Sequence, residues 1–287
     1  MTRLKTNDIK NIPSSLTDYD YRLQAATGKN LLGIAAHTWG VFEKDLKHTI
    51  NAFCIHVIPV TAGQGVINDF SETVCAILKF LGFQAKVSVF SDVSGLASAY
   101  ENKADAVMLA DDRRFVGINL HTCAVADNSE VTGRVFASAL DLMTGGIRER
   151  SVLVIGCGPV GAAGAEWLLR LGAGVALYDI RPGAAAMLRE KLINNRNTGH
   201  VHVLDDINMK FNRFSCIFEA TPADNTIPDE WVSDQLIVTA PGVPLGVSDK
   251  GRIKLENRLI HDKLELGVAA MAVSLVLNLN LGDLTSL

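Results

Sequence analysis

Residues 151–179 read SVLVIGCGPVGAAGAEWLLRLGAGVALYD, and this stretch predicts the fold of the second half of the chain. The apolar run Val152 to Ile155 is typical of a strand buried on both faces of a parallel sheet. It leads directly into a turn with three glycines, an alanine-rich helix that ends near Arg170, and a second apolar strand that ends at Asp179. Strand, glycines, helix, second strand and terminal acid in this order favour a dinucleotide site over a βαβ unit without a ligand.

Each glycine of the turn has its own mechanical role in such a site. Gly156 permits the tight turn, Gly158 lets a pyrophosphate approach the backbone, and Gly161 lets the helix pack close to the strand. The start of the helix then offers free N–H groups and the positive end of its dipole to phosphates. Asp179 is placed to accept hydrogen bonds from a ribose diol, so NAD is expected over NADP. Arg181 complicates this prediction, because arginine commonly serves 2′-phosphate sites.

The chain beyond Asp179 continues the doubly wound α/β pattern, with predicted strands at 214–218 and 235–239 and a closing apolar helix at about 267–277. In open parallel sheets ligands bind beyond the carboxyl ends of the strands, so the residues after these two strands should border the nicotinamide half of the cofactor. The predicted cofactor contacts are Gly156, Gly158, Pro159, Val160, Gly161, Asp179, Ile180, Arg181, Ala220, Thr221, Pro222, Ala240 and Pro241.

Composition is that of a cytoplasmic enzyme. The chain has 287 residues, is 48% hydrophobic and carries a formal net charge of −4, so no basic excess points to nucleic acid. The N-terminus is polar, and the longest apolar run, 266–277, is shorter than the ~20 residues of a membrane span. We therefore expect neither a nucleic-acid nor a membrane partner. The five cysteines have no metal-ligand spacing, nor do His56, His121 and His261, so no metal is expected.

The first half also has an α/β pattern, preceded by helices. Strands are predicted at 52–58, 85–90 and 104–109, and the last delivers Asp111 and Asp112 at its carboxyl end. A helix over 128–143 would link the halves, and Gly145-Gly146 marks a hinge. The sequence thus predicts a substrate-binding domain over residues 1–146. A Rossmann domain that includes the C-terminal helix would span residues 147–287.

Further motifs stand along the chain outside the nucleotide turn. They are Asn11-Ile-Pro-Ser14, Thr27-Gly-Lys-Asn-Leu-Leu-Gly-Ile-Ala-Ala36, His56-Val-Ile-Pro-Val-Thr61, Leu109-Ala-Asp-Asp112, Phe218-Glu-Ala-Thr-Pro222 and Asn225-Thr-Ile-Pro228. Together these motifs resemble one narrow family, the pyrrolysine-forming dehydrogenases. The resemblance runs over nearly the whole chain and is strongest in the predicted substrate half. Segments 42–51 and 66–69 and the turn at Cys157 depart from the family's pattern.

This resemblance implies a particular reaction. The substrate would be a lysine acylated on its ε-nitrogen by 3-methylornithine, and NAD would take a hydride from the carbon that bears the terminal amine. The ornithine α-amine would then attack the resulting imine, ammonia would leave, and a pyrroline ring would remain. Ring closure of this kind is largely an effect of proximity. The family likeness and the apolar C-terminal helix also make a homodimer plausible.

The substrate contacts are expected on the strand ends and loops of the first half. Asp111 would hold the substrate amine and, as a desolvated carboxylate with a raised pKa, accept its proton, with Asp112 in support. The alternative for this pair is a solvated loop. Further substrate contacts are expected at Leu4, Val60, Thr61, Ala62, Asn68 and Asn119, for which turn or packing roles are the alternative.

Two other functions fit the same nucleotide motif. One is another two-domain NAD-dependent dehydrogenase that acts on an amino acid or a hydroxy acid. The other is a non-catalytic NAD-binding regulator, such as a redox sensor. Formation of NADH on addition of the lysine–methylornithine dipeptide would separate the three.

Overall fold

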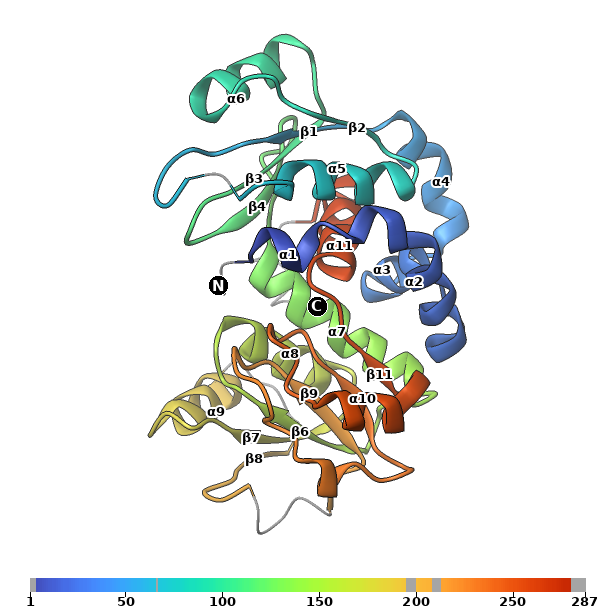
Figure 1. Ribbon diagram of the computed structural model, residues 1–287, viewed down its shortest axis with the longest axis vertical. Helices are drawn as coiled ribbons and strands as arrows, with labels where there is room; N and C mark the ends of the chain where they lie inside the picture. The colour runs from blue at the N-terminus through green and yellow to red at the C-terminus, as the bar shows by residue number, and fades with distance from the viewer. Residues whose placement is uncertain (1–3, 66, 195–199, 208–212, 280–287) are drawn as a thin grey trace. The chain divides into compact units, whose positions relative to one another are not determined.

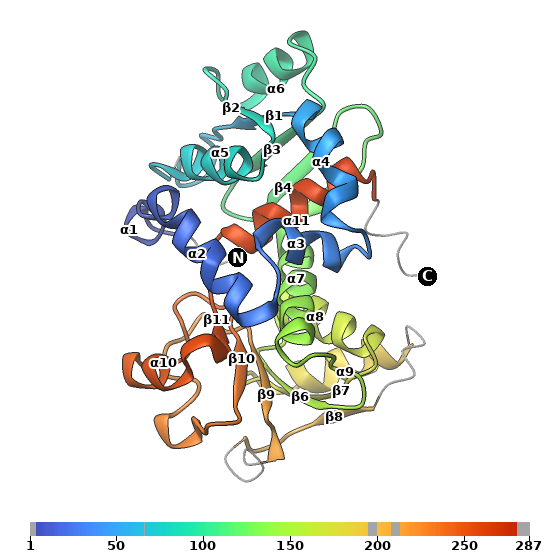
Figure 2. The same ribbon diagram turned by 90° about the vertical axis from the view of Figure 1, so that its right-hand side faces the viewer.

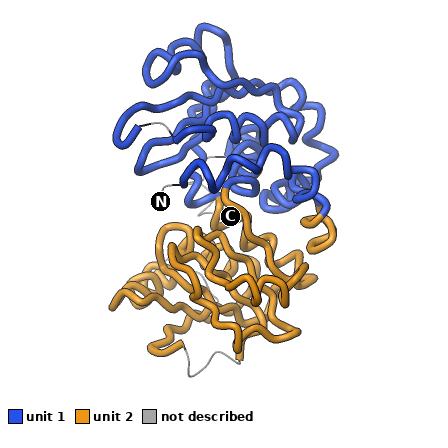
Figure 3. Tube along the Cα trace, in the orientation of Figure 1, with its two compact units in different colours: residues 1–21, 30–131, 264–287 blue, residues 22–29, 132–263 orange. Residues whose placement is uncertain are grey.

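The computed structural model describes residues 4–65, 67–194, 200–207 and 213–279, which form two compact units. Unit 1 comprises Met1–Tyr21, Asn30–Val131 and Leu264–Leu287, and unit 2 comprises Arg22–Lys29 and Thr132–Lys263 (Figure 3). Each unit contains one sheet and its covering helices, so the predicted two-domain α/β fold is confirmed.

The unit boundaries differ from the predicted division at Gly145-Gly146. Helix α11 (Glu265–Val276) belongs to unit 1, where it packs on α3 (Leu31–Thr38) and α5 (Phe70–Phe80). Its residues 265–275 are all buried, and a helix that is apolar on every face needs neighbours all round. Most of α7 (Asn128–Met143) belongs instead to unit 2.

Unit 2 is built on a parallel sheet of six strands in the order β11-β10-β9-β6-β7-β8. Figure 2 shows β9, β6, β7 and β8 side by side. From β6 the chain builds outward through β7 and β8, and then returns to build the other side from β9. This reversal creates a topological switch point between β6 and β9, where ligands bind in such sheets. The strands are β6 (Ser151–Ile155), β7 (Gly174–Tyr178), β8 (Val201–Val203), β9 (Cys216–Glu219), β10 (Ile237–Thr239) and β11 (Leu259–Ile260).

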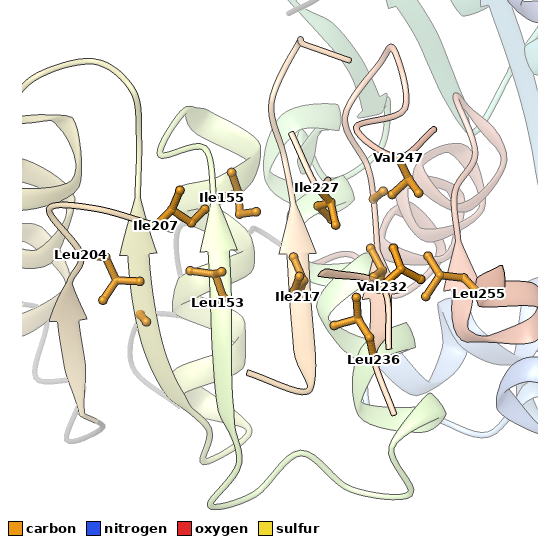
Figure 4. Packing of buried hydrophobic residues seen from close by; sticks show 13 residues of the cluster. Leu153, Ile155, Leu204, Ile207, Ile217, Ile227, Val232, Leu236, Val247 and Leu255 are labelled. Carbon is orange, nitrogen blue, oxygen red and sulfur yellow. The ribbon is translucent and has the colours of Figure 1, made fainter. Parts of the chain in front are cut away.

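Buried aliphatic residues fix the loops of unit 2 on one face of this sheet. Leu153 and Ile217 of the central strands lie in one cluster with Ile227 and Val247, which come from the loops that follow β9 and β10 (Figure 4). The helices of the unit are α8 (Pro159–Arg170), α9 (Ala184–Asn194) and α10 (Asp249–Leu255), with 3₁₀ turns at Asp229–Trp231 and Glu256–Arg258.

Unit 1 has a five-stranded mixed sheet in the order β2-β1-β3-β4-β5. The first three strands of this order are parallel, and β4 and β5 pair antiparallel. The sequence predicted the parallel strands but not the antiparallel strands β4 and β5. The strands are β1 (Cys54–Ile58), β2 (Gln84–Val87), β3 (Ala106–Ala110), β4 (Phe115–Asn119) and β5 (Val125–Asp127).

Helices cover both faces of the unit 1 sheet. Figure 1 shows α6 on one side of the strands and α5 and α11 on the other, in agreement with their contacts to the strands. The remaining helices are α1 (Thr6–Ile9), α2 (Ile12–Thr27), α4 (Glu43–Ala52) and α6 (Asp92–Glu101). Within the described residues, no helix is long and apolar enough to cross a membrane.

Candidate nucleotide and substrate sites

The three glycines of the turn after β6 lie in three different structural environments. Gly156 has φ +93°, and a Cβ there would lie 2.8 Å from the carbonyl oxygen of Ala220. A Cβ on Gly161 would clash with the carbonyl oxygen of Gly156, so helix and turn pack in direct contact. Gly158 precedes α8 with φ −73°, and a Cβ there would meet no atom within 4 Å. Fold geometry thus requires Gly156 and Gly161, whereas the space at Gly158 is open.

The N-terminus of α8 fits a pyrophosphate. Pro159 occupies the first turn, where a missing N–H costs nothing, and no side chain caps this end of the helix. The open space at Gly158 lies against the same turn, and Val160 follows Pro159 inside it. Backbone N–H groups and the helix dipole would both favour a phosphate there.

Asp179 lies immediately after β7, with both carboxylate oxygens occupied. Its Oδ2 accepts hydrogen bonds from the Cys157 backbone N–H at 2.7 Å and from Arg181 Nη2 at 3.0 Å. Its Oδ1 accepts from the Arg181 backbone N–H at 2.8 Å and from Arg181 Nε at 3.1 Å. Burial raises the pKa of Asp179, but the hydrogen bonds and charge of Arg181 and the Cys157 N–H outweigh it, and the pKa lies below its usual range. Arg181 therefore neutralises the acid that was expected to select NAD.

The residues after β9 and β10 lie on the same edge of the sheet. A Cβ on Gly156 would lie 3.0 Å from Thr221 Cγ2, which brings the phosphate turn and the β9 loop together. Ala240 is fully buried, so only its backbone could face a ligand, and its carbonyl oxygen already lies 2.7 Å from His261 Nδ1. Pro222 and Ile180 are exposed, whereas Pro241 is half-buried. The structure thus brings the predicted cofactor contacts together at the carboxyl ends of β6, β7, β9 and β10.

Cys157 sits inside this turn as an unreactive thiol. Burial, with the nearby charge of Asp179, raises the pKa of Cys157 to about 12, so the thiol stays protonated at neutral pH. This favours a packing role over a nucleophilic one.

A second cluster of polar groups lies at the carboxyl ends of β1, β2 and β3 in unit 1. The loop 59–65 follows β1 and is held on both sides. Thr61 donates to Asp92 through its backbone N–H at 2.8 Å and through its hydroxyl at 2.6 Å. On the other side the Gln64 N–H donates to Asp112 Oδ2 at 2.7 Å. We call this region, residues 59–65 with Asp92 and Asp111–Arg114, the β1–β3 edge.

Gly63 shows why the loop can come so close to Asp112. Its φ is +71°, and a Cβ there would clash with the Asp112 carboxylate. Asp112 is therefore held against the loop after β1 by a direct contact with its backbone. Within the same loop Val60 is half-buried and Ala62 is exposed.

Asp111 differs from the prediction in its pKa. The carboxylate is exposed, and its Oδ1 accepts the backbone N–H groups of Arg113 and Arg114 at 2.7 Å each. The Arg114 and Arg113 hydrogen bonds lower its pKa, so the expected desolvated carboxylate with a raised pKa is wrong. Asp111 closes the tight turn between β3 and β4, and a carboxylate in such a turn is stabilised in its charged form.

Asn119 was predicted at the substrate site, but it lies at the opposite end of the sheet. It pairs with Ala106, whereas Phe115 pairs with Ala110 next to Asp111, so Asn119 is about 13 Å away along the strands. Its Nδ2 donates to the carbonyl oxygen of Leu275 at 3.0 Å and its oxygen accepts the His121 N–H at 2.9 Å. Asn119 anchors α11, and the structure does not bring it together with Asp111.

The remaining predicted contacts are placed less tightly. Leu4 is half-buried just ahead of α1, which packs on α5, and Asn68 is exposed in the loop before α5. Two polar residues that were not among the predicted contacts also lie here: Asp92, which binds Thr61, and Asn128, which begins α7 directly after β5. Because Asp127 pairs with Val116 beside the β3–β4 turn, Asn128 lies near the β1–β3 edge. In the sequence Asn128 stands in the polar pair Asp127-Asn128.

Comparisons with known proteins cover both units. A family model described as the N-terminal domain of pyrrolysine biosynthesis protein PylD matches residues 8–126. A second model, the C-terminal domain of alanine dehydrogenase/PNT, matches residues 124–244. Pyrrolysine synthase of Methanosarcina barkeri is 34% identical over 276 residues, which covers 96% of this chain and 98% of the relative. Pyrrolysine synthase of Methanosarcina acetivorans is 32% identical, over 96% of this chain and 100% of the relative.

Solved structures with the same fold are more distant in sequence. Quinate dehydrogenase from Corynebacterium glutamicum, in complex with NAD, has a TM-score of 0.54 and 14% identity, with coverage of 82% of this chain and 97% of that protein. Shikimate dehydrogenase from Aquifex aeolicus has a TM-score of 0.53 and 15% identity, with coverage of 79% and 93%. These likenesses show a dehydrogenase-type fold.

Proposed function

Because the chain belongs to the pyrrolysine synthase family, we propose that it oxidises the terminal amine of lysine-Nε-3-methylornithine with NAD and thereby forms pyrrolysine. It is an oxidoreductase of pyrrolysine biosynthesis with a dehydrogenase-type nucleotide domain. The observation that supports this proposal is the open space for a phosphate at Gly158, close to Asp179, in a chain whose first half matches the family.

The cofactor would be held by unit 2. Gly158 and the first turn of α8 would bind the pyrophosphate, and Asp179 would face the adenosine ribose. Thr221 and Pro222, after β9, would border the nicotinamide half. Bound NAD supplies the acceptor for a hydride from the carbon next to the terminal amine.

The substrate amine would be held by the β1–β3 edge of unit 1. The low pKa of Asp111 keeps this carboxylate charged at neutral pH, so it can attract a terminal ammonium. The carboxylate of Asp112 is fixed by the Gln64 N–H and would add to the same field. Asn128 and the hydroxyl of Thr61 are the neutral polar groups that we assign to the same edge.

The charge of Asp111 has a defined consequence for the proton. A hydride leaves the carbon only when the amine lone pair is free, so the ammonium must first release one proton. Since hydrogen bonds lower the pKa of Asp111, this carboxylate orients the ammonium and the proton passes to water. Loss of the hydride leaves an iminium ion, the α-amine adds to its carbon, and ammonia departs as the ring C=N bond forms. The protein accelerates ring closure by holding the two ends of the substrate together.

The test is NADH formation, followed by absorbance, on addition of the synthetic dipeptide. We expect turnover with the dipeptide and none with free ornithine, lysine or simple hydroxy acids. Asp111→Asn should lower kcat/KM by about 10²-fold, the scale of losing one hydrogen bond between charged groups. Asp45→Asn, an exposed carboxylate in the first turn of α4, is the matched control. Turnover of a different amino acid in preference to the dipeptide would refute the proposed substrate.

A further inference from the structure

Glu219 is a fully buried carboxyl at the end of β9 that has no role in the proposed mechanism. Its Oε1 accepts two hydrogen bonds from Thr221, one from the backbone N–H at 2.8 Å and one from the hydroxyl at 2.5 Å. Both polar donors of Thr221 therefore point at a single carboxyl oxygen. Thr221 stands in the loop that we place beside the nicotinamide half of the cofactor.

The second oxygen, Oε2, fills space that two glycines leave open. A Cβ on Gly242 would lie 2.7 Å from Oε2, and one on Gly246 would lie 2.9 Å from it. Within the described residues, Oε2 is buried and accepts no hydrogen bond of ordinary geometry. The carboxyl of Glu219 thus lies between the loop after β9 and the loop after β10.

These two loops are also joined to each other. The Ile227 N–H donates to the Gly246 carbonyl oxygen at 2.9 Å, and Ile227 and Val247 form a parallel bridge. Both side chains are buried in the cluster on the sheet face (Figure 4). The backbone N–H of Gly242 donates to the Glu219 carbonyl oxygen at 3.2 Å. A shift at Glu219 would therefore move both loops together.

The surroundings of this carboxyl favour its neutral form. Burial raises the pKa of Glu219 to about 7, and the hydrogen bonds from Thr221, together with the polar groups of Thr226 and the Gly246 backbone, only partly oppose this. All three of these groups are uncharged. His261 directly follows β11. Burial lowers the pKa of His261, and the positive charges of Lys263 and Arg252 lower it further.

We propose that Glu219 is a positioning residue whose carboxyl holds Thr221 and the two loops in the shape that the nicotinamide half of the cofactor requires. This inference rests on the cofactor site proposed above. It assigns no contact between Glu219 and the cofactor, because the carboxyl is covered by the two loops.

Hydrogen exchange of the cofactor-free protein tests the hold on the loops directly. If opening of the loops exposes Glu219, the protection factors of the non-proline residues within 220–226 and 240–247 should fall about tenfold per pH unit between pH 5 and 7, and then level. In Glu219→Gln, which keeps an acceptor but cannot ionise, protection should not change over this range. Glu166→Gln makes the same chemical change on α8, where the glutamate pairs with Arg170, and should match the wild type. Identical pH profiles in the wild type and Glu219→Gln would overturn the proposal.

Ligand binding separates positioning from general stability. Glu219→Met keeps the length of the side chain and removes both oxygens. We expect it to weaken NADH binding by about tenfold, equivalent to about 1.4 kcal/mol. ADP-ribose, which lacks the nicotinamide, should bind within about twofold of the wild type, and Glu219→Gln should restore NADH affinity. Equal losses for NADH and ADP-ribose, or no loss for NADH, would overturn the proposal. Failure of the wild type to bind either ligand would instead refute the cofactor site, and the exchange profiles would still decide whether Glu219 holds the loops.

Discussion

Replacement of Glu219 by Gln should change how the stability of unit 2 depends on pH. An exposed glutamate titrates near 4.5, whereas burial raises the pKa of Glu219 in the folded protein to about 7. Below pH 4.5 the folded and unfolded states both bind this proton, between 4.5 and 7 only the folded state does, and above 7 neither does. The free energy of unfolding should therefore fall through this window as the pH rises, and then level.

The magnitude follows from the difference in pKa. The pKa rises by about 2.5 pH units, and each unit corresponds to about 1.4 kcal/mol, so the wild type should lose about 3 kcal/mol between pH 4.5 and 7. Glu219→Gln lacks this titration and should lose none of it. Every other titrating group is common to both proteins and cancels in their difference.

Thermal unfolding of both proteins from pH 5 to pH 8 measures this difference. At about 2–4 °C per kcal/mol, the Tm of Glu219→Gln relative to the wild type should rise by about 5–10 °C up to pH 7, and then stay level. Any constant cost of burying the amide shifts the whole curve and leaves its slope unchanged. A Tm difference that is independent of pH would refute the argument that Glu219 is buried in its neutral form.

Three further predictions test the two sites. Arg181→Ala should leave the charge of Asp179 without its ion pair and strengthen the preference for NAD over NADP by about tenfold or more, measured as the ratio of the kcat/KM values. An unchanged ratio would show that the ion pair does not determine the choice of cofactor. Gly158→Val should abolish NADH binding in calorimetric titration with little change in Tm, whereas Gly161→Ala should lower Tm through its clash with the turn, at a cost of about 1–3 kcal/mol; the opposite pattern would reverse the two roles. Asp112→Asn should weaken the hold on the Gln64 N–H and raise KM for the dipeptide more than it lowers kcat, and an effect on kcat alone would contradict this.

The nucleotide half could be predicted from the sequence because its signals are local. An apolar strand, a glycine turn and a helix follow one another within a single βαβ unit, so Gly156 and Asp179 could be placed from short-range pattern alone. The ion pair of Asp179 with Arg181 could not. Whether an arginine faces solvent, a phosphate or the neighbouring acid depends on side-chain rotamers that spacing does not determine.

The substrate half was harder because its geometry depends on strand pairing. Asn119 and Asn128 are both polar residues at the ends of strands. Only the pairing register of β3, β4 and β5 shows that they lie at opposite ends of these strands. For Asp111 the strand-end position was predictable. Its low pKa was not, because it comes from a turn that directs two backbone N–H groups at one oxygen.

The placement of α11 in unit 1 has a consequence for the order in which the protein matures during synthesis. The chain emerges from the ribosome N-terminus first, so residues 132–263 of unit 2 are complete before α11 has been made. Until then the unit 1 sheet would lack the helix that buries one of its faces, and Asn119 would lack its anchor on Leu275. Unit 1 begins the chain but would finish folding last, so a nascent or truncated chain that ends before residue 264 would expose apolar surface to chaperones and proteases.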